Sequence, residues 1–385
     1  MKKHIKLLVV LGIILVGSFS FYLFKGYKKD ALVYENNKIK PSSSGIAMML
    51  ETSAGSGNYE MTTRSEWPTE GYVFNANLSK CENGSELSWD NENKKVLMSG
   101  NKSDKCYVYF DVYVKPQVLL ADYVKSLYVS NNGENGIYHH DASLTNGAGD
   151  NSYRYAGASD QVNNYVCFGS TTTPCPTDNL YRIIGVFGDK VKLIKSTSVG
   201  NMKWDSNNKN TWSTSSLNTY LNNEFINTFD VGTKGKIADT TWKVGGNTYD
   251  NIAKQPVKTS YQNEVVNPVP GSTSSNGETE SSVKVGLMYA SDYGFAAAQS
   301  AWTSTLYDYD GEAIKNVNWM YLGAYEWTIS HNADTSDCVF NVNYTGFVNF
   351  NYANDTYAVR PVFSLTSSVN YASGSGSATD PIVVN

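Results

Sequence analysis

The chain has 385 residues, of which 41% are hydrophobic, enough to bury one large core or two modest ones. Charged residues make up 17%, below the roughly 25% of ordinary globular domains, and Asn, Ser, Thr and Tyr take their place. The net charge of -5 and the pI near 5.5 argue against a nucleic-acid partner, because nucleic-acid-binding domains usually carry an excess of basic residues. This composition suits an all-β extracellular protein with long polar loops.

The N-terminal segment contains an uncharged run over residues 7–24, preceded by three lysines. Its length is close to the shortest that spans a bilayer as a helix. A cleaved signal peptide has the same basic start and apolar core, but no small-residue cleavage site follows, and Phe21 and Phe24 are bulky. We therefore expect residues 1–29 to be an uncleaved single-pass anchor, with a signal segment as the alternative, and the C-terminal bulk to be extracellular.

Short candidate strands separated by Gly, Asn and Ser turns follow a polar stalk at residues 30–44. They predict a small β-sandwich-like module over residues 45–115. Residues 116–150 are expected to form a helix, with apolar side chains at three- and four-residue spacing, and then a linker. The linker carries His139, His140 and Asp141, which we interpret as a solvated turn rather than a metal site.

The five cysteines divide into two local pairs and one residue left over. Cys81 and Cys106 bracket one segment, Cys167 and Cys175 bracket a short loop, and Cys338 stands alone. Local pairs in an exported chain predict disulfides. None has the Cys-x-x-Cys spacing of a zinc site, so we expect neither a metal nor a cofactor.

Residues 151–385 are expected to form one continuous α+β domain that is rich in strands. A hairpin is predicted over residues 181–194, a helix over 217–229, an exposed insertion over 262–282 and a closing strand over 358–365. Within this domain, residues 338–352 alternate between apolar side chains and asparagines. Because asparagine is disfavoured in strands, the pattern predicts a hairpin with one buried face and one exposed asparagine face kept for contact.

Residues 181–186, the segment 212–222 and Trp327 followed by residues 358–361 resemble a bacterial domain family of unassigned function. That family is similar in turn to C-type lectin-like domains and to the sulfatase-modifying (formylglycine-generating) enzymes. The resemblance covers about residues 150–385, since boundaries from sequence are coarse. It implies a C-type lectin-like domain whose first and last strands lie together, with residues 181–186 beside 382–384 as the expected pair.

The chain departs from these relatives at the positions that carry their chemistry. The formylglycine-forming oxidases use two neighbouring cysteines, whereas Cys338 has no partner nearby. Calcium-dependent lectins carry Glu-Pro-Asn or Gln-Pro-Asp, whereas this chain has Gln255, Pro256 and Val257 and lacks the carboxylate. Neither the oxidase reaction nor the calcium site is carried over.

The C-terminal third also resembles the variable region of lectin-fold proteins diversified by retroelements, which is rich in Asn, Tyr, Asp and Ser. Tyrosine and asparagine suit recognition, because they combine large contact area with adaptable hydrogen bonding. The predicted ligand-binding residues are Tyr325, His331, Asn332, Asp334, Asn341, Asn343, Tyr344, Asn349, Asn351, Tyr352, Asn354, Asp355 and Tyr357.

Three functions compete. The first is a surface-displayed, non-catalytic, adhesin-like protein that binds an extracellular protein or glycan. The second is a structural component of a cell-surface or phage assembly. The third is an oxidase-like enzyme, for which Cys338 beside Asp337 is the only candidate nucleophile; the neighbouring carboxylate makes it less reactive. We expect the first, and we expect serine at Asn341, Asn343, Asn349 and Asn351 to leave folding intact and to remove adhesion or ligand capture.

Overall fold

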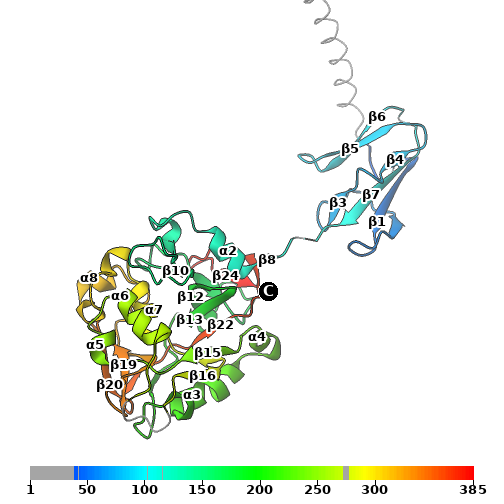
Figure 1. Ribbon diagram of the computed structural model, residues 1–385. Helices are drawn as coiled ribbons and strands as arrows, with labels where there is room; N and C mark the ends of the chain where they lie inside the picture. The colour runs from blue at the N-terminus through cyan, green and yellow to red at the C-terminus, as the bar shows by residue number, and fades with distance from the viewer. Residues whose placement is uncertain (1–38, 42, 102, 115, 272–276) are drawn as a thin grey trace, which may run out of the picture. The chain divides into compact units, whose positions relative to one another are not determined.

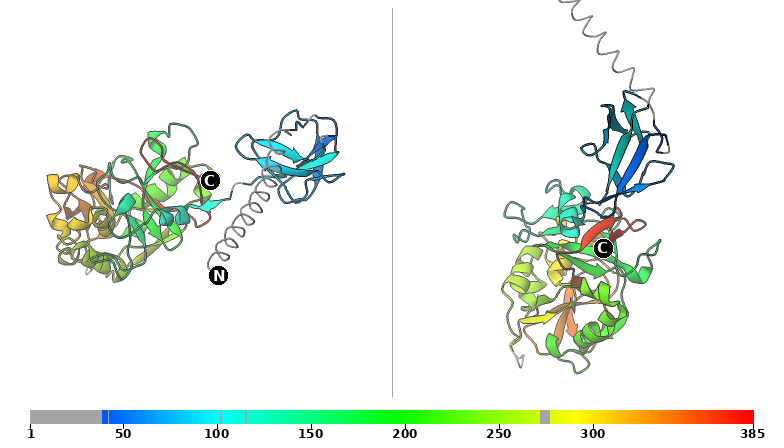
Figure 2. Two further views of the ribbon diagram at one scale, coloured as in Figure 1. Left: turned by 90° about the horizontal axis from the view of Figure 1, so that it is seen from above. Right: turned by 90° about the vertical axis from the view of Figure 1, so that its right-hand side faces the viewer.

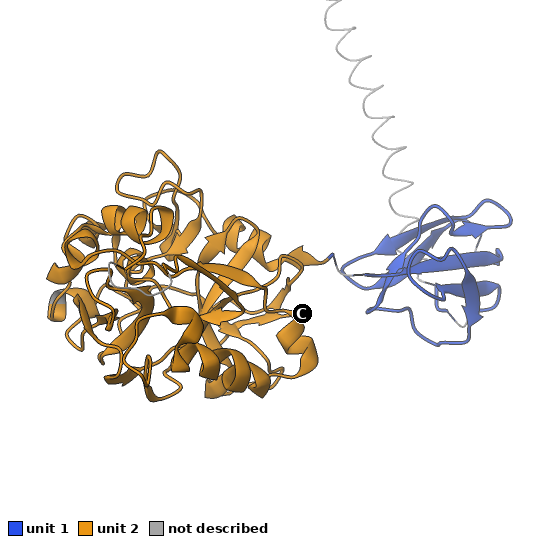
Figure 3. Ribbon diagram, turned by 60° about the horizontal axis from the view of Figure 1, so that its bottom comes forward, with its two compact units in different colours: residues 1–116 blue, residues 117–385 orange. Residues whose placement is uncertain are grey.

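The computed structural model describes residues 39–41, 43–101, 103–114, 116–271 and 277–385 (Figure 1). The anchor expected over residues 1–29 and most of the stalk lie outside this range. None of the described helices is long and apolar enough to cross a membrane. The structure is β-rich, with 32% strand and 19% helix, which confirms that part of the expected fold class. The chain divides after Pro116 into two compact units (Figure 3).

The first unit is a mixed β-sheet with an added hairpin. The sheet has the order β2-β1-β7-β3, and β4 also pairs with β7. Strands β1 and β7 are parallel, and their apolar side chains pack against the hairpin β5–β6 around Val108 and Phe110. The strands are β1 Ile46–Glu51, β2 Tyr59–Thr62, β3 Tyr72–Phe74, β4 Lys80–Cys81, β5 Glu86–Asp90, β6 Lys95–Ser99 and β7 Cys106–Val112.

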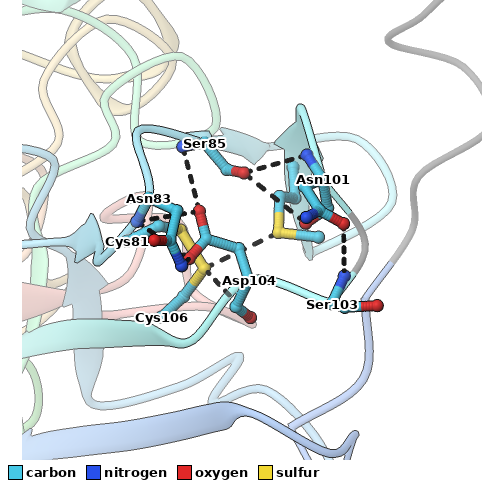
Figure 4. The surroundings of a disulfide bond; sticks show 8 residues. Cys81, Asn83, Ser85, Asn101, Ser103, Asp104 and Cys106 are labelled. Atoms are coloured by element: carbon cyan, nitrogen blue, oxygen red, sulfur yellow. Dashed lines mark hydrogen bonds between the residues drawn. A yellow bond between two sulfur atoms is a disulfide. The ribbon is translucent and has the colours of Figure 1, made fainter.

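The disulfide between Cys81 and Cys106 joins β4 to β7 in this unit and confirms one expected pair (Figure 4). Beside it, the fully buried Asp104 accepts hydrogen bonds from the backbone N–H groups of Asn83 (3.0 Å) and Ser85 (3.1 Å). Burial by itself raises the pKa of Asp104, but the hydrogen bonds from Ser85 and Asn83 outweigh it and lower the pKa to about 2. A carboxylate thus holds together the loop next to the disulfide.

The second unit contains a large sheet with the order β17-β22-β13-β12-β11-β24-β23-β8, extended by β10 and β9 (Figure 1). Its central hairpin β12–β13 turns at Gly188, whose φ of 65° suits glycine, as expected from the sequence. The strands are β8 Val118–Leu119, β9 Ile137–His139, β10 Tyr153–Tyr155, β11 Tyr165–Cys167, β12 Leu180–Phe187, β13 Lys190–Lys195, β17 Val285–Gly286, β22 Val362–Ser364, β23 Asn370–Ser373 and β24 Ile382–Val384.

A second, five-stranded sheet has the order β14-β21-β18-β19-β20. Its strands are β14 Asn201–Lys203, β18 Glu326–His331, β19 Cys338–Val342, β20 Val348–Tyr352 and β21 Thr356–Ala358, and a separate two-stranded sheet pairs β15 Thr240–Lys243 with β16 Glu280–Val283. The closing strand expected over residues 358–365 is therefore wrong as one element. The chain leaves the five-stranded sheet after β21 and enters the large sheet at β22.

Short helices connect the strands. The apolar face expected over residues 217–229 is confirmed, since Leu217, Leu221 and Phe225 are all buried. The helices and helical turns are α2 Leu120–Ser126, η1 Glu134–Gly136, η2 Thr177–Asn179, η3 Trp212–Thr214, α3 Ser216–Thr219, η4 Tyr220–Glu224, η5 Phe225–Thr228, α4 Val231–Gly235, α5 Tyr249–Ile252, α6 Val257–Tyr261, η6 Gln262–Val266, α7 Ala290–Phe295, η7 Gln299–Ala301, η8 Leu306–Asp308 and α8 Glu312–Lys315.

Three expectations about this unit are corrected. Residues 116–150 contain the expected helix, α2, but they do not end in a linker, because Leu120 and Val124 of the helix and Ile137 after it are all buried in the core of the second unit. Residues 262–282 are not wholly an exposed insertion, because Glu264 has no exposed surface and β16 pairs with β15. Strands β12 and β24 are not neighbours, because β11 lies between them. The first strand of the unit, β8, instead pairs with β23 near the C-terminus (Figures 1 and 2).

Candidate functional site

The expected hairpin is present as β19 and β20, with Cys338 opposite Tyr352 and Val342 opposite Val348. Its turn is closed by Asn343, whose side-chain oxygen accepts a hydrogen bond from the backbone N–H of Thr345 at 3.0 Å. This is the local bond that asparagine makes in preference to extending a strand. The asparagine at this position therefore shapes the turn.

The expected exposure of the asparagine face is wrong at its centre. Asn341 has 0% of its surface exposed and Asn343 has 6%. Asn341 donates from Nδ2 to Oδ1 of Asn351 at 3.1 Å, while Asn349 and Asn351 are half-buried. Some asparagines of this hairpin therefore stabilise the fold, because a buried amide needs a hydrogen-bond partner.

One accessible part of the predicted surface is a group of aromatic side chains. Tyr325 stacks on Tyr357 with ring centroids 4.8 Å apart and contacts Tyr344 at 5.4 Å. Tyr344 is 55% exposed, and its backbone carbonyl accepts a hydrogen bond from the hydroxyl of Tyr321 at 2.5 Å. We call Tyr321, Tyr325, Tyr344 and Tyr357 the tyrosine cluster.

The strand order explains why these tyrosines meet. Glu326 on β18 pairs with Ala358 on β21 and with Val342 on β19, so Tyr325 lies between Tyr357 and the turn that carries Tyr344. The fully buried Trp327 packs against the cluster, with its ring centroid 4.5 Å from that of Tyr357. A rigid strand and a buried indole thus hold rings that are partly open to solvent.

The electrostatics of the cluster favour hydrogen bonding over reaction. Burial raises the pKa of Tyr357, and Asp355, which accepts a bond from its hydroxyl at 3.3 Å, raises it further. The phenol therefore stays protonated at neutral pH. Stacked rings with neutral hydroxyls can pack against the apolar face of a ligand and hydrogen-bond its rim.

The other predicted ligand-binding residues are dispersed. His331 and Asn332 are buried at the end of β18. Asp334 is exposed and accepts a hydrogen bond from the backbone N–H of Tyr249 at 3.3 Å. Tyr352 and Asn354 are exposed at the open end of the hairpin, away from the turn that carries Tyr344. Sequence reasoning missed Tyr321, whose only signal was its place four residues before Tyr325.

The cysteines of the second unit are one buried free thiol and one disulfide. Cys338 is buried with a free thiol, and burial together with Asp337 raises its pKa, which makes it a weak nucleophile. The second expected disulfide, between Cys167 and Cys175, is confirmed. Within the described parts of the chain, no three His, Cys, Asp or Glu side chains gather as around a metal ion.

A groove of about 620 Å³ lies elsewhere on the second unit, and the sequence analysis did not anticipate it. Tyr181, Phe225 and Phe229 form part of its wall. Lys195 lines it too and donates from Nζ to the backbone carbonyl of Asp178 at 3.1 Å. Burial lowers the pKa of Lys195. The groove brings residues of β12, β13 and η5 together, so only the fold reveals it.

A family model for a domain of unknown function, DUF6273, matches residues 188–367. This stretch contains the β12–β13 turn, the five-stranded sheet and the tyrosine cluster. The expected resemblance to a domain family of unassigned function is thereby confirmed over these residues, and the match says nothing of lectins or of formylglycine-generating enzymes. No curated protein and no solved structure matches the chain.

Proposed function

We propose that this chain is a non-catalytic, adhesin-like binding protein whose tyrosine cluster contacts an extracellular protein or glycan. The observation that carries the proposal is the stack of Tyr325 on Tyr357 beside the exposed Tyr344. Tyrosine offers large contact area at a low cost in side-chain entropy, and here the rings are already held in place by β18, β21 and Trp327. A surface ordered before binding loses less free energy on contact.

We propose that the protein acts outside the cell, attached through its N-terminal segment. The two disulfides support an oxidising compartment, since such bonds persist mainly in exported proteins. The apolar run over residues 7–24 supports attachment to the membrane. Protease accessibility of the C-terminal unit on intact cells tests both statements, because a cytoplasmic unit is protected until the cells are lysed.

A lectin-like relationship of the second unit is a further proposal. Two observations support it: the unit is β-rich, and its first strand, β8, lies beside β23 near its end. An experimental structure with a different strand order would contradict it. The alternative of a structural component in a surface or phage assembly predicts association with other assembly proteins and no effect of Tyr344 on ligand capture.

Tyr344→Ser tests the binding surface, and Tyr352→Ser is its matched control. The two tyrosines are 55% and 56% exposed and lie at opposite ends of the same hairpin. The full chain, immobilised on beads, is probed with a glycan array, peptidoglycan sacculi and host-cell ectodomains. We expect Tyr344→Ser to reduce capture of the bound probe at least ~10-fold, as for a contact worth about 1.4 kcal/mol or more, and Tyr352→Ser to leave it unchanged. Equal retention in both variants refutes the proposed surface.

A further inference from the structure

A cluster of four charged side chains in the second unit takes no part in the proposed binding surface. Lys192 comes from β13, Asp292 from α7, Arg154 from β10 and Asp150 from the turn before it. The side chains of Lys192 and Asp292 are only 8% and 2% exposed. Charges this deep in a core are costly to keep unless they are paired.

Lys192 and Asp292 are in direct contact, Nζ against Oδ2. The same Oδ2 accepts a hydrogen bond from the backbone N–H of Tyr289 at 3.0 Å, which fixes the carboxyl group at the start of α7. The other oxygen, Oδ1, lies 3.7 Å from Nη1 of Arg154. The two carboxyl oxygens therefore have different surroundings, one facing an amine and the other a guanidinium.

Aromatic rings surround the lysine nitrogen. Its Nζ lies 4.5 Å from the ring centroid of Tyr289, 5.4 Å from that of Trp242 and 5.5 Å from that of Phe187. These rings exclude water from the pair, and burial lowers the pKa of Lys192, which favours its neutral amine. An amine held against a carboxyl group in a dry site is arranged for condensation, since proximity removes most of its entropic cost.

We propose that Lys192 and Asp292 are the site of an intramolecular amide crosslink. Nζ of Lys192 forms a bond to Cγ of Asp292, and the bond from Cγ to Oδ2 breaks. An ammonium and a carboxylate together become one amide and one water, which takes Oδ2 and two protons from the nitrogen. No oxidant, reductant or further reactant is needed. Arg154 faces Oδ1, the oxygen that carries negative charge during the attack and remains as the amide oxygen.

The charges that remain after this reaction stay paired. Arg154 keeps Asp150, whose Oδ2 lies 2.6 Å from Nη2, and the hydroxyl of Tyr261 also donates to this oxygen at 2.8 Å. The crosslink removes one positive and one negative charge together, so it leaves neither residue as an unpaired buried ion. It ties β13 to α7 across a sequence separation of 100 residues, independently of any ligand at the tyrosine cluster.

Peptide mass spectrometry of the purified full chain tests the crosslink. The protein is denatured and reduced, so that its disulfides open, and is then digested. We expect one branched peptide containing Lys192 and Asp292, lighter than its two parts by one water. Complete recovery of the two separate, unlinked peptides would overturn the proposal and leave an ordinary buried ion pair.

Two variants sharpen this test. Asp292→Asn retains the carbonyl and loses ammonia instead of water, so it must yield the branched peptide with the same mass as the wild type. Lys192→Met must abolish the branched peptide, whereas Lys190→Met, on the same strand, must retain it. A branched peptide that survives Lys192→Met, or is absent from Asp292→Asn while the folded wild type contains it, contradicts the chemistry.

Discussion

Asn341 donates a hydrogen bond to Asn351 across the β19–β20 hairpin, at 3.1 Å from Nδ2 to Oδ1, although its register partner is Asn349. The bond is therefore diagonal, and it occupies the amide expected to face a ligand. Asn341 has no exposed surface, so it acts on the hairpin and not on a partner. The expectation that serine at all four asparagines leaves folding intact does not fit this geometry.

Asn341→Ala should destabilise the second unit by about 1–2 kcal/mol, because it removes a buried hydrogen bond and leaves a small cavity. Asn349→Ala, on the same face but half-buried, should change the free energy of unfolding by no more than about 0.5 kcal/mol. Urea unfolding followed by tryptophan fluorescence measures both. Equal losses in the free energy of unfolding of the two variants would show that the buried position of Asn341 adds nothing to stability beyond that of Asn349.

Arg360→Met should lower the free energy of unfolding by about 3–5 kcal/mol, because it leaves the buried carboxylate of Glu326 without a positively charged partner. Arg360 lies in the crossing between the two sheets and binds Glu326 through Nε at 2.6 Å and Nη2 at 2.8 Å. Lys315→Met breaks the exposed pair with Glu312 and should cost less than about 1 kcal/mol. Thermal unfolding of the two variants side by side gives the comparison, and similar midpoints would contradict it.

Acid should destabilise the protein through His331. Burial lowers the pKa of His331 to about 4, while a backbone hydrogen bond to Val244 partly opposes this. The unfolded chain takes up the proton near the ordinary histidine pKa of 6.5, so stability is lost as the pH falls from about 6.5 towards 4, by about 3 kcal/mol at most for this one group.

Urea midpoints between pH 7 and pH 4 measure this dependence. His331→Gln should flatten it. His140 is buried too, and its pKa is lowered by burial and by Arg154, so part of the slope remains in His331→Gln. An unchanged slope in that variant would show that His331 takes up its proton at the same pH in the folded and the unfolded chain, and would contradict the prediction.

The Cys81–Cys106 disulfide should stabilise the first unit by about 3 kcal/mol, because it closes a loop across a sequence separation of 25 residues. Serine at both positions should lower the unfolding transition of this unit alone. Serine at Cys167 and Cys175 is the control, since those residues belong to the second unit. Calorimetry of the full chain resolves the two transitions, and a loss confined to the second unit would contradict the assignment.

Local patterns predicted local structure well. Alternation over residues 338–352 predicted the hairpin, and the spacing of Leu217, Leu221 and Phe225 predicted the helical face, because both periods follow from backbone geometry. Cysteine spacing predicted both disulfides. The same alternation failed to predict exposure, since it assigns residues to a face but does not tell whether another part of the chain covers that face.

The sequence by itself determined that the protein is β-rich, that four of its cysteines form two local pairs, and that it lacks the cysteine pair of the formylglycine-forming oxidases and the calcium motif of the lectins. Tertiary structure decided which polar residues remain open to solvent. It placed β11 between β12 and β24, buried Asn341, and brought Tyr321, Tyr325, Tyr344 and Tyr357 together. Contacts between residues far apart in the chain depend on how sheets pair and cover one another, and no short window of sequence contains that information.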